Sequence, residues 1–165
     1  MDQKNAVIRR ALPSDWTDIL EIYAAARQFM RQAGNPDQWG DAFPPEELIR
    51  EDLRLGRNYV CELDGRVQGV FAFIPGEDPT YRVIRGAWLS DRPYCAVHRL
   101  ASRGEVPGVA GLILSWCLEQ CGNVRIDTHE KNRPMRRALE KAGFVPCGTI
   151  LCDDGTPRIA FQKTI

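Results

Sequence analysis

One loop between two strongly apolar segments constrains the fold of this chain more than any other feature. The segment YCAVHRLA at residues 94–101 has the length and composition of a buried strand, and LILSWCLEQC at residues 112–121 is apolar on nearly all sides. Between them lies RGEVPGVAG at residues 103–111. Because glycine and proline interrupt regular structure, this pattern predicts a strand, a turn and a buried helix that begins near residue 109.

The rest of the chain also alternates between strand-like and helix-like patterns, which predicts one α/β domain, residues 1–165, with a mixed sheet of about seven strands and about four helices. We expect Ser14 to be the N-cap of the first helix, Asp64-Gly65 to form a hairpin turn, and Asn132 to cap the last helix. The predicted elements, in chain order, are a strand at 6–10, helices at 13–34 and 45–56, a hairpin at 58–76, a strand at 94–101, a helix at 109–121, a strand at 123–130, a helix at 133–143 and a hairpin at 144–163.

The charge balance excludes several classes of partner. Lysine and arginine number 22, and aspartate and glutamate also number 22, so no net field favours nucleic acid or a membrane surface. The N-terminal segment MDQKNAVIRRALPSDW lacks the apolar stretch of a signal peptide, and no apolar run approaches the ~20 residues of a membrane span. We therefore expect a cytoplasmic protein.

The six cysteines predict neither a disulfide framework nor a metal site. No CxxC motif occurs. Cys117 and Cys121 are four residues apart and share a helix face, so they could in principle supply two metal ligands. The simpler interpretation is that the cysteines are small buried hydrophobic residues in a reducing compartment.

A strand, a glycine loop and a helix form a unit that can bind an anion. The first N–H groups of a helix lack partners within it, and Gly108 and Gly111 would let a phosphate approach the backbone. Neither GxxxxGK[ST] nor a GxGxxG with a following acidic residue is present. Taken alone, the loop is equally compatible with an ordinary turn.

Two longer segments carry a resemblance to a known family. HRLAS, the glycine loop and GVAGLILSWCLEQC are similar to the strand, pyrophosphate loop and helix of the GNAT superfamily of acetyl-CoA-dependent N-acetyltransferases. RIDTHEKNRPMRRALEKAGF resembles the following strand and helix of that family, with Asn132 at the strand end and Lys141, Gly143 and Phe144 closing the helix. The resemblance implies the GNAT fold, with the strands at 94–101 and 123–130 splayed to form a cofactor cleft.

The resemblance implies acetyl-CoA as the acyl donor and no metal. The pantetheine arm would pair with the backbone of the strand end and the side chain of Asn132, and the pyrophosphate would lie on the loop. Arg103, Arg133, Arg136 and Arg137 are candidates for the phosphates, although each could equally belong to a solvated surface. The implied cofactor-binding residues are Leu100, Ala101, Ser102, Pro107, Gly108, Val109, Ala110, Gly111, Asn132, Met135 and Arg136.

Two residues depart from the family pattern. Glu105 stands where the family loop usually has a glutamine or arginine, so its side chain must point away from a pyrophosphate or weaken its binding. Leu139 stands where many relatives have a tyrosine that protonates the departing thiolate. That acid is therefore missing, and water or another side chain must replace it.

Three residues are candidates for acid–base chemistry. His98 lies on the strand before the loop, near the place where some amine acetyltransferases of the family have a base. His129 follows the next strand, and Asp127 is two residues earlier on the same face. Histidine suits proton removal at neutral pH. Alternatively, His98 is a core-facing histidine with a backbone partner, and His129 caps a turn.

Substrate recognition in the family comes from the segment between the first two helices and from hairpins opposite the cofactor. These regions contain Trp39 and Tyr81, and Trp39 could line the acceptor pocket or simply pack on the core. We expect acetyl transfer to a primary amine of a small molecule or to a protein amino group, with a homodimer possible. The alternative is a non-catalytic GNAT-fold module that binds acyl-CoA as a sensor or in a regulatory role, which Glu105 and Leu139 favour.

Overall fold

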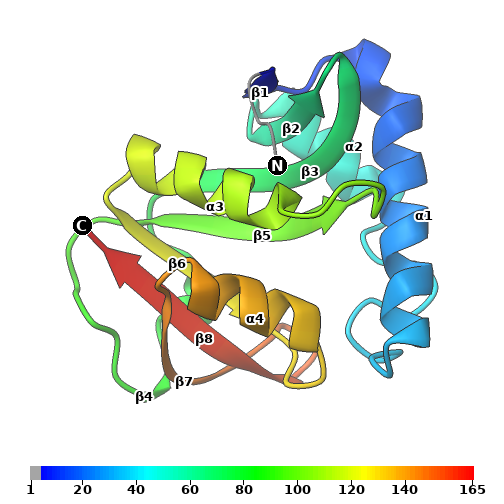
Figure 1. Cartoon of the computed structure of the whole chain (residues 1–165). Helices are drawn as coiled ribbons and strands as arrows, with labels where there is room; N and C mark the ends of the chain where they lie inside the picture. Colours follow the sequence, from blue (N-terminus) through cyan, green and yellow to red (C-terminus); the bar gives the residue numbers. More distant parts are fainter. Residues whose placement is uncertain (1–4) are drawn as a thin grey trace.

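One mixed sheet of eight strands organises the molecule, in the order β1-β2-β3-β5-β6-β8-β7-β4 (Figure 1). The structure is a computed structural model that describes residues 5–165. The elements are β1 (Ala6–Arg10), α1 (Trp16–Gln32), α2 (Glu46–Arg54), β2 (Asn58–Leu63), β3 (Arg66–Pro75), β4 (Arg85–Gly86), β5 (Cys95–Ser102), α3 (Val109–Gln120), β6 (Asn123–Thr128), α4 (Arg133–Lys141), β7 (Val145–Leu151) and β8 (Pro157–Thr164). Two short 3₁₀ turns, η1 (Pro13–Asp15) and η2 (Pro79–Tyr81), complete the order.

The four α-helices match the expected number, and the sheet has one strand more than the seven expected. The additional strand is β4, a two-residue segment that pairs with β7 through Arg85↔Thr149 and Gly86↔Gly148. A strand of two residues is too short to show the alternation by which strands are recognised in a sequence. It therefore left no signal.

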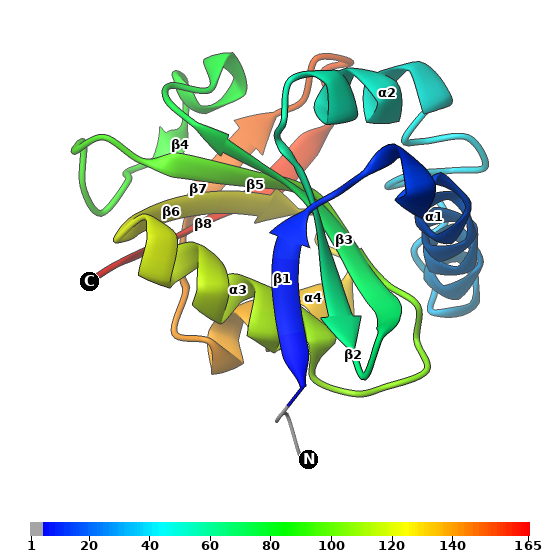
Figure 2. The same ribbon diagram turned by 90° about the horizontal axis from the view of Figure 1, so that it is seen from above.

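The two faces of the sheet are covered by different helices. Helices α3 and α4 pack on one face, in front of the sheet in Figure 1, where Val97, Ile126 and Phe161 meet Ile113 and other apolar residues of α3. Helices α1 and α2 cover part of the opposite face, on the side away from α3 in Figure 2. The prediction that α3 is buried is confirmed only for the face that packs against the sheet and α4, because Gly111, Ser115 and Glu119 on its outer side are exposed.

A glycine in β3 sets the distance between α3 and the sheet. A Cβ atom on Gly69 would lie 2.8 Å from Cγ1 of Val109 and 3.0 Å from Cδ1 of Ile113. Any larger residue at position 69 would therefore push the first turn of α3 away from the strands. The start of α3 is held in place by this close contact.

Strands β5 and β6 are parallel neighbours that separate along their length. They pair at Cys95↔Val124, Ala96↔Arg125 and Val97↔Ile126, and no further pair joins them among residues 5–165. β5 nevertheless continues to Ser102 in register with β3, and β6 continues to Thr128 in register with β8. The backbone of Leu100, Ala101 and Ser102 therefore faces a gap on its β6 side, as the resemblance implied.

The separation begins at an irregularity in β5. The register with β3 shifts between Val70 and Ala72, and Arg99 adopts a left-handed φ of 52°. Positive φ is unfavourable for a residue with a side chain, so it must be held by its surroundings. Asp52 of α2 accepts two hydrogen bonds from the Arg99 guanidinium, each 2.9 Å long, and the Tyr23 hydroxyl donates to the Arg99 carbonyl oxygen at 2.8 Å. Both helices of that face thus hold the bulge.

Of the turn and the cap predicted from short sequence signals, one is confirmed and one is wrong. Asp64 and Gly65 form the predicted hairpin turn, with φ values of 52° and 79°. The prediction that Ser14 caps α1 is wrong, because residues 13–15 form a 3₁₀ turn and α1 begins at Trp16. The carboxylate of Asp15 accepts a hydrogen bond from the Leu12 N–H at 2.7 Å, which closes the start of this 3₁₀ turn, and no side chain of residues 5–165 caps α1.

All six cysteines are free thiols, and Cys61, Cys95 and Cys117 are buried. Burial raises the pKa of the Cys117 thiol well above its usual range, as expected for a cysteine that acts as a core residue. Within residues 5–165, no helix is long and apolar enough to cross a membrane, and no cluster of three metal-ligating side chains occurs.

Candidate active site

The first turn of α3 presents free backbone donors beside the gap between β5 and β6. Gly108 is the N-cap of α3, with a left-handed φ of 85°, and its carbonyl accepts the first intrahelical hydrogen bond from Leu112 at 3.1 Å. The N–H groups of Val109, Ala110 and Gly111 therefore have no partner within the helix. Cβ atoms added at Gly108 or Gly111 would meet nothing within 4 Å, so the backbone is open to a ligand on this side. Free donors, an open backbone and the positive end of a helix dipole suit an anionic group.

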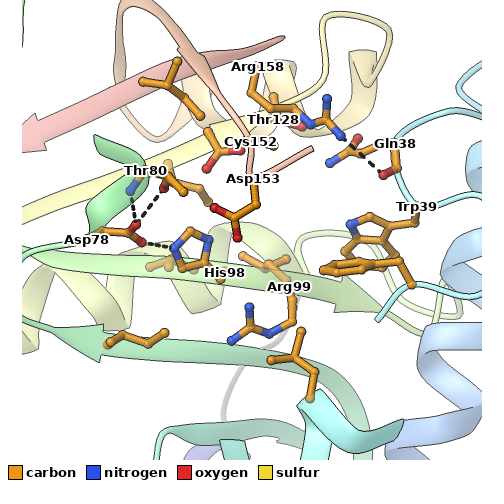
Figure 3. A pocket seen from close by; sticks show the side chains of 18 of the residues that line it. Gln38, Trp39, Asp78, Thr80, His98, Arg99, Thr128, Cys152, Asp153 and Arg158 are labelled. Carbon is orange, nitrogen blue, oxygen red and sulfur yellow. Dashed lines mark hydrogen bonds and ion pairs between the residues drawn. The ribbon is translucent and has the colours of Figure 1, made fainter. Parts of the chain in front are cut away.

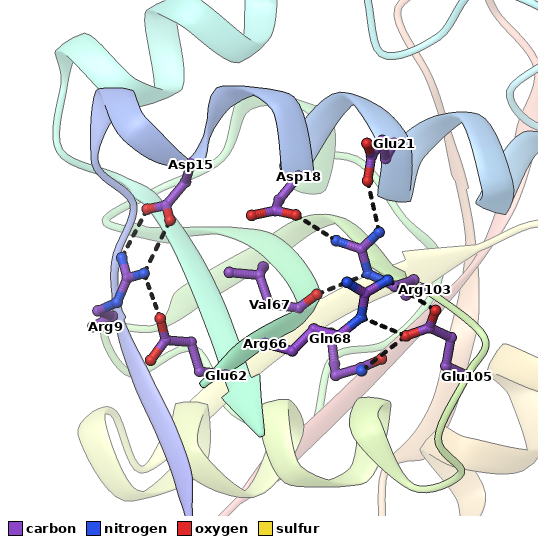
Figure 4. Close-up of polar contacts among 10 residues, drawn as sticks. All are labelled: Arg9, Asp15, Asp18, Glu21, Glu62, Arg66, Val67, Gln68, Arg103 and Glu105. Atoms are coloured by element: carbon purple, nitrogen blue, oxygen red, sulfur yellow. Dashed lines mark hydrogen bonds and ion pairs between the residues drawn. The ribbon is translucent and has the colours of Figure 1, made fainter. Parts of the chain in front are cut away.

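Glu105, the unexpected acid in the loop, is bound by neighbouring residues of β3. Arg66 donates two hydrogen bonds to its carboxylate, at 2.7 Å and 2.9 Å, and the Gln68 amide donates one at 3.1 Å (Figure 4). These hydrogen bonds lower the pKa of Glu105 to about 2. Its charge is thus balanced by Arg66, and the acid does not act as an isolated repulsive group.

The basic candidates for phosphate contact differ in their surroundings. Arg103 is nearly buried and donates to Asp18, Glu21 and the Val67 carbonyl oxygen (Figure 4), so its charge is already used within the fold. Arg133 and Arg136 line a smaller cavity of about 380 Å³, together with Lys131 and the end of α1. Arg137 is exposed on α4.

Asn132 caps α4 as predicted, since its side-chain oxygen accepts a hydrogen bond from the Met135 N–H at 3.2 Å. Its amide donates to Gln38 Oε1 at 2.9 Å, which ties the start of α4 to the segment between α1 and α2. Both Asn132 and Met135 line the larger pocket described next. A ligand that uses the Asn132 amide would have to compete with Gln38.

A pocket of about 840 Å³ opens where β5 and β6 separate. Figure 3 shows Asp153 and Arg158 of the β7–β8 hairpin, His98 and Arg99 of β5, and Gln38 and Trp39 of the α1–α2 segment around it. Trp39 packs edge-on against Tyr23, with ring centroids 5.7 Å apart, and also lines the pocket. Both interpretations of Trp39 made from the sequence thus describe its position.

His98 lines the pocket and is oriented by a carboxylate. Its Nε2 atom lies 2.5 Å from Oδ2 of Asp78, which also accepts hydrogen bonds from the Thr80 N–H and hydroxyl. Burial would raise the pKa of Asp78, but the hydrogen bonds from His98 and Thr80 outweigh it and lower that pKa to about 2. Because Asp78 is ionised at neutral pH, Nε2 carries the hydrogen of this bond. Nδ1 is then the nitrogen that can accept a proton.

Asp127 also lines the pocket, and Tyr81 holds it. The Tyr81 hydroxyl donates to Asp127 Oδ2 at 2.7 Å, and the Tyr81 ring lies beside the His98 ring with centroids 5.7 Å apart. Burial and the nearby Asp127 charge raise the pKa of Tyr81 well above its usual value, so the hydroxyl remains a donor. Tyr81, which the sequence suggested as an acceptor contact, is 1% exposed and is not among the residues that line the pocket. It orients Asp127 instead.

His129 lies outside the lining of this pocket. Its Nδ1 accepts a hydrogen bond from the Lys131 N–H at 3.1 Å, which is the turn-capping role considered as the alternative. Burial and the nearby Arg158 lower the pKa of His129. Sequence spacing placed it close to Asp127, but the chain turns after Thr128 and carries the ring away from the pocket, which argues against a catalytic role.

The position of the missing tyrosine is part of the core, because Leu139 is fully buried between α4 and the sheet. A different hydroxyl lies near the end of β6. Thr128 lines the pocket, and its Oγ1 atom is buried without a hydrogen-bond partner within residues 5–165. Buried hydroxyls without partners are rare, so this atom is available to a ligand.

Several pocket residues were not identified from the sequence. Asp78 precedes Pro79 and Thr80, a turn signature that could have drawn attention to it, and it does cap η2. Arg158 and Asp153 gave no comparable signal, since an arginine and an aspartate near a hairpin turn are common. The place of Arg158 depends on its contact with the distant Gln38, which a single sequence does not reveal.

The fold and the site define a class of α/β protein in which a split strand pair lies beside a free helix N-terminus and a deep pocket. No protein-family model and no curated protein matches the sequence. Among solved structures, a GNAT-family acetyltransferase from Streptococcus agalactiae 2603 is 31% identical, with 100% of this chain and 98% of that chain covered and a TM-score of 0.88. The chain therefore belongs to the GNAT family.

More distant structures share the fold. YncA of Salmonella typhimurium, solved with its cofactor acetyl-CoA, is 17% identical over 98% of this chain and 94% of that chain, with a TM-score of 0.64. An aminoglycoside acetyltransferase solved with coenzyme A is 18% identical over 97% and 95%, with a TM-score of 0.65. At this level of identity, the similarity concerns the fold alone.

Proposed function

We propose that the protein is an acetyl-CoA-dependent N-acetyltransferase that modifies a primary amine of a small molecule or a protein amino group. The observation that carries this proposal is the gap between β5 and β6. The free N–H groups of α3 lie on one side of this gap, and the pocket lined by His98 lies on the other. The names of the solved relatives, which are acetyltransferases, support the donor and the reaction class.

The residues fit acetyl-CoA in four places. The N–H groups of Val109, Ala110 and Gly111 suit a pyrophosphate, and the smaller cavity beside Lys131, Arg133 and Arg136 suits a further phosphate. The unpaired edge of β5 at residues 100–102 suits the amides of a pantetheine arm. The buried Thr128 hydroxyl is a free donor near the end of the gap, at which a departing thiolate could be stabilised.

On the acceptor side, the amine must lose a proton before it can attack the thioester carbonyl carbon. His98 is the proposed base, because Asp78 fixes its tautomer and leaves Nδ1 free to take that proton. Asp127, held by Tyr81, attracts the ammonium form of the amine into the pocket. Attack then forms the amide bond and the carbon–sulfur bond breaks, and the thiolate takes a proton from water or from the His98 ring that received the proton of the amine.

The second candidate function is a non-catalytic module that binds acyl-CoA. Leu139 favours it, because the usual acid of the family is replaced by a core residue. The two functions differ in turnover, not in cofactor binding.

A thiol-release assay with acetyl-CoA distinguishes them. We expect 5,5′-dithiobis-(2-nitrobenzoate) to report coenzyme A release that depends on both the protein and an added amine, across amino acids, polyamines and aminoglycosides. Calorimetry with acetyl-CoA in the same buffer is the control. Tight binding without turnover on any amine would favour the binding module, and stabilisation by ATP but not by coenzyme A would contradict both functions.

A further inference from the structure

Arg158 is a buried arginine whose charge has no carboxylate partner in the part of the chain that the structure describes. It is 8% exposed, and its guanidinium donates to the Thr156 hydroxyl at 3.1 Å, the Pro157 carbonyl oxygen at 2.9 Å and the Gln38 carbonyl oxygen at 3.4 Å. All three acceptors are neutral. No carboxylate oxygen lies within 4 Å of it among residues 5–165. A buried charge without an opposite charge is unfavourable, so this position calls for an anion.

The other well-buried arginines of the fold each contact a carboxylate or an aromatic ring. Arg99 shares Asp52 with Arg57, and Arg103 pairs with two acids of α1. Arg125 lies over the rings of Trp88 and Tyr94, 4.1 Å from each centroid. Three arginines line the pocket within residues 5–165, Arg57, Arg99 and Arg158, and Arg158 is the one that has no ion pair with a carboxylate.

Arg158 shares a face of the sheet with the proposed base. Asp127 of β6 lies opposite Ala160 of β8, and Arg158 is two residues from Ala160 on the same face. Arg125 is two residues from Asp127 and so lies on this face too. Its partner on β5 is Ala96, and His98, two residues further along β5, is therefore on the same face. Two residues along a strand span about 7 Å. The negative side chain of Asp127 and the positive side chain of Arg158 are therefore close enough for one small molecule to contact both.

The remaining acids of the lining are mostly engaged. Asp37 pairs with Lys131 at 3.5 Å, Glu77 pairs with Arg82 at 3.1 Å, and Asp78 holds His98. Asp154 accepts two hydrogen bonds from Thr156, which lower its pKa, and Arg158 lowers it further from beyond ion-pair distance. Asp153 is exposed in the hairpin turn. Within residues 5–165, Asp127 and Arg158 are thus the acid and the arginine of the lining that are not exposed and have no ion-pair partner.

We propose that the acceptor carries a carboxylate as well as its amine, so that the substrates are of the amino-acid class and Arg158 binds the carboxylate. This inference rests on the proposed N-acetyltransferase function. The guanidinium of arginine matches a carboxylate with two parallel hydrogen bonds, and such charge-assisted pairs are stronger than neutral ones. A diamine of similar length would instead bring a second ammonium group against Arg158.

Matched acceptor pairs test the inference. The pairs are L-leucine with isopentylamine, L-methionine with 3-(methylthio)propylamine, and L-lysine with cadaverine. The measurements are thiol release at saturating acetyl-CoA and calorimetric binding of each compound to the protein loaded with coenzyme A. We expect at least one amino acid to have a KM and a Kd about 10- to 100-fold lower than those of its decarboxylated partner.

Variants assign this preference to Arg158. Arg158→Gln should remove it, by raising the amino acid's KM about 10- to 100-fold while the partner amine stays within about twofold. Arg92→Gln, which changes an exposed arginine, is the matched control and should keep the wild-type ratio. Arg158→Lys keeps the positive charge but loses the two parallel donors of the guanidinium, so its preference for the amino acid should lie between those of the wild type and Arg158→Gln. If Arg158→Gln does not fold, the wild-type ratios and Arg158→Lys carry the test.

Three results would overturn the inference: equal affinity or preference for the amines lacking a carboxylate, preference for cadaverine over lysine, or equal loss for both members of a pair in Arg158→Gln. Thiol release with such a result would leave the acetyltransferase function intact. Binding of an amino acid that depends on Arg158, without thiol release from any acceptor, would instead contradict the acetyltransferase function.

Discussion

At the scale of single residues, the pocket depends on two side chains that are each fixed by another residue. Asp78 fixes the His98 ring, and Tyr81 fixes the Asp127 carboxylate. The Tyr81 ring also lies beside the His98 ring, so the two pairs are in contact. A base that is already oriented loses no time or free energy in finding its tautomer when the substrate arrives. The four residues therefore act as a connected unit.

Replacing His98 tests its role as the base. We expect His98→Ala to lower kcat about 100-fold or more, because general base catalysis typically contributes about 10²–10⁴. The Kd for acetyl-CoA, measured by calorimetry, should stay within about twofold, since His98 lies on the acceptor side. Asp78→Asn is the matched positioning variant and should cost less, because the base remains but its orientation weakens. An unchanged kcat in His98→Ala would make His98 a structural residue.

The sequence identified His98 and Asp127 but not their partners. A histidine and an aspartate near two predicted strand ends could be read directly from residue type and position. Asp78 is 20 residues from His98, and Tyr81 is 46 residues from Asp127, so these contacts exist only in the folded chain. The same reasoning applies to His129, because its place outside the pocket lining depends on the path of a turn.

At the scale of elements, the loop that begins α3 and the bulge of β5 together place the start of α3 beside the gap. The bulge at Arg99 turns β5 away from β6, and the loop then returns the chain so that α3 starts beside the gap. The sequence predicted this arrangement well, because glycines and apolar runs are local signals. It missed β4 and the bulge itself, which depend on pairing and on the hold of Asp52 from α2.

Gly108 tests the loop as the phosphate site. Gly108→Asp should raise the Kd for acetyl-CoA about tenfold or more, because it adds a negative charge beside the free donors of α3. Gly108→Asn is the matched control: it has the same shape and tolerates the same left-handed φ, but it is neutral. Calorimetry should show a much smaller loss for asparagine. Equal Kd values for the two variants would contradict the assignment.

At the scale of the whole molecule, distant parts of the chain meet around the pocket. Gln38 of the α1–α2 segment accepts from Asn132 at the start of α4 and, through its carbonyl oxygen, from Arg158 of β8. The two halves of the sheet, joined directly by only three pairs between β5 and β6, are thus also joined across the opening. These hydrogen bonds of Gln38 therefore both line the pocket and hold the two halves of the sheet together.

The acid dependence of stability follows from the contact between Asp78 and His98. Asp78 has a folded-state pKa of about 2, below its usual value of 3.8, so its contribution is complete above about pH 4 and is lost as the pH falls towards 2. A shift of this size corresponds to about 2 kcal/mol. Urea unfolding between pH 7 and pH 3 should therefore be less pH-dependent in Asp78→Asn than in the wild type. Asp153→Asn, at an exposed turn position, is the control, and equal slopes for Asp78→Asn and wild type would refute the assignment.

The central claim is that the gap between β5 and β6 connects an acyl-CoA site on α3 with an amine site at His98. A crystal structure with acetyl-CoA tests it most directly. We expect the pyrophosphate on the N–H groups of Val109, Ala110 and Gly111, the pantetheine arm along residues 100–102, and the acetyl group at the pocket that His98 and Asp127 line. A pyrophosphate bound away from α3, or an acetyl group that does not reach this pocket, would contradict the account.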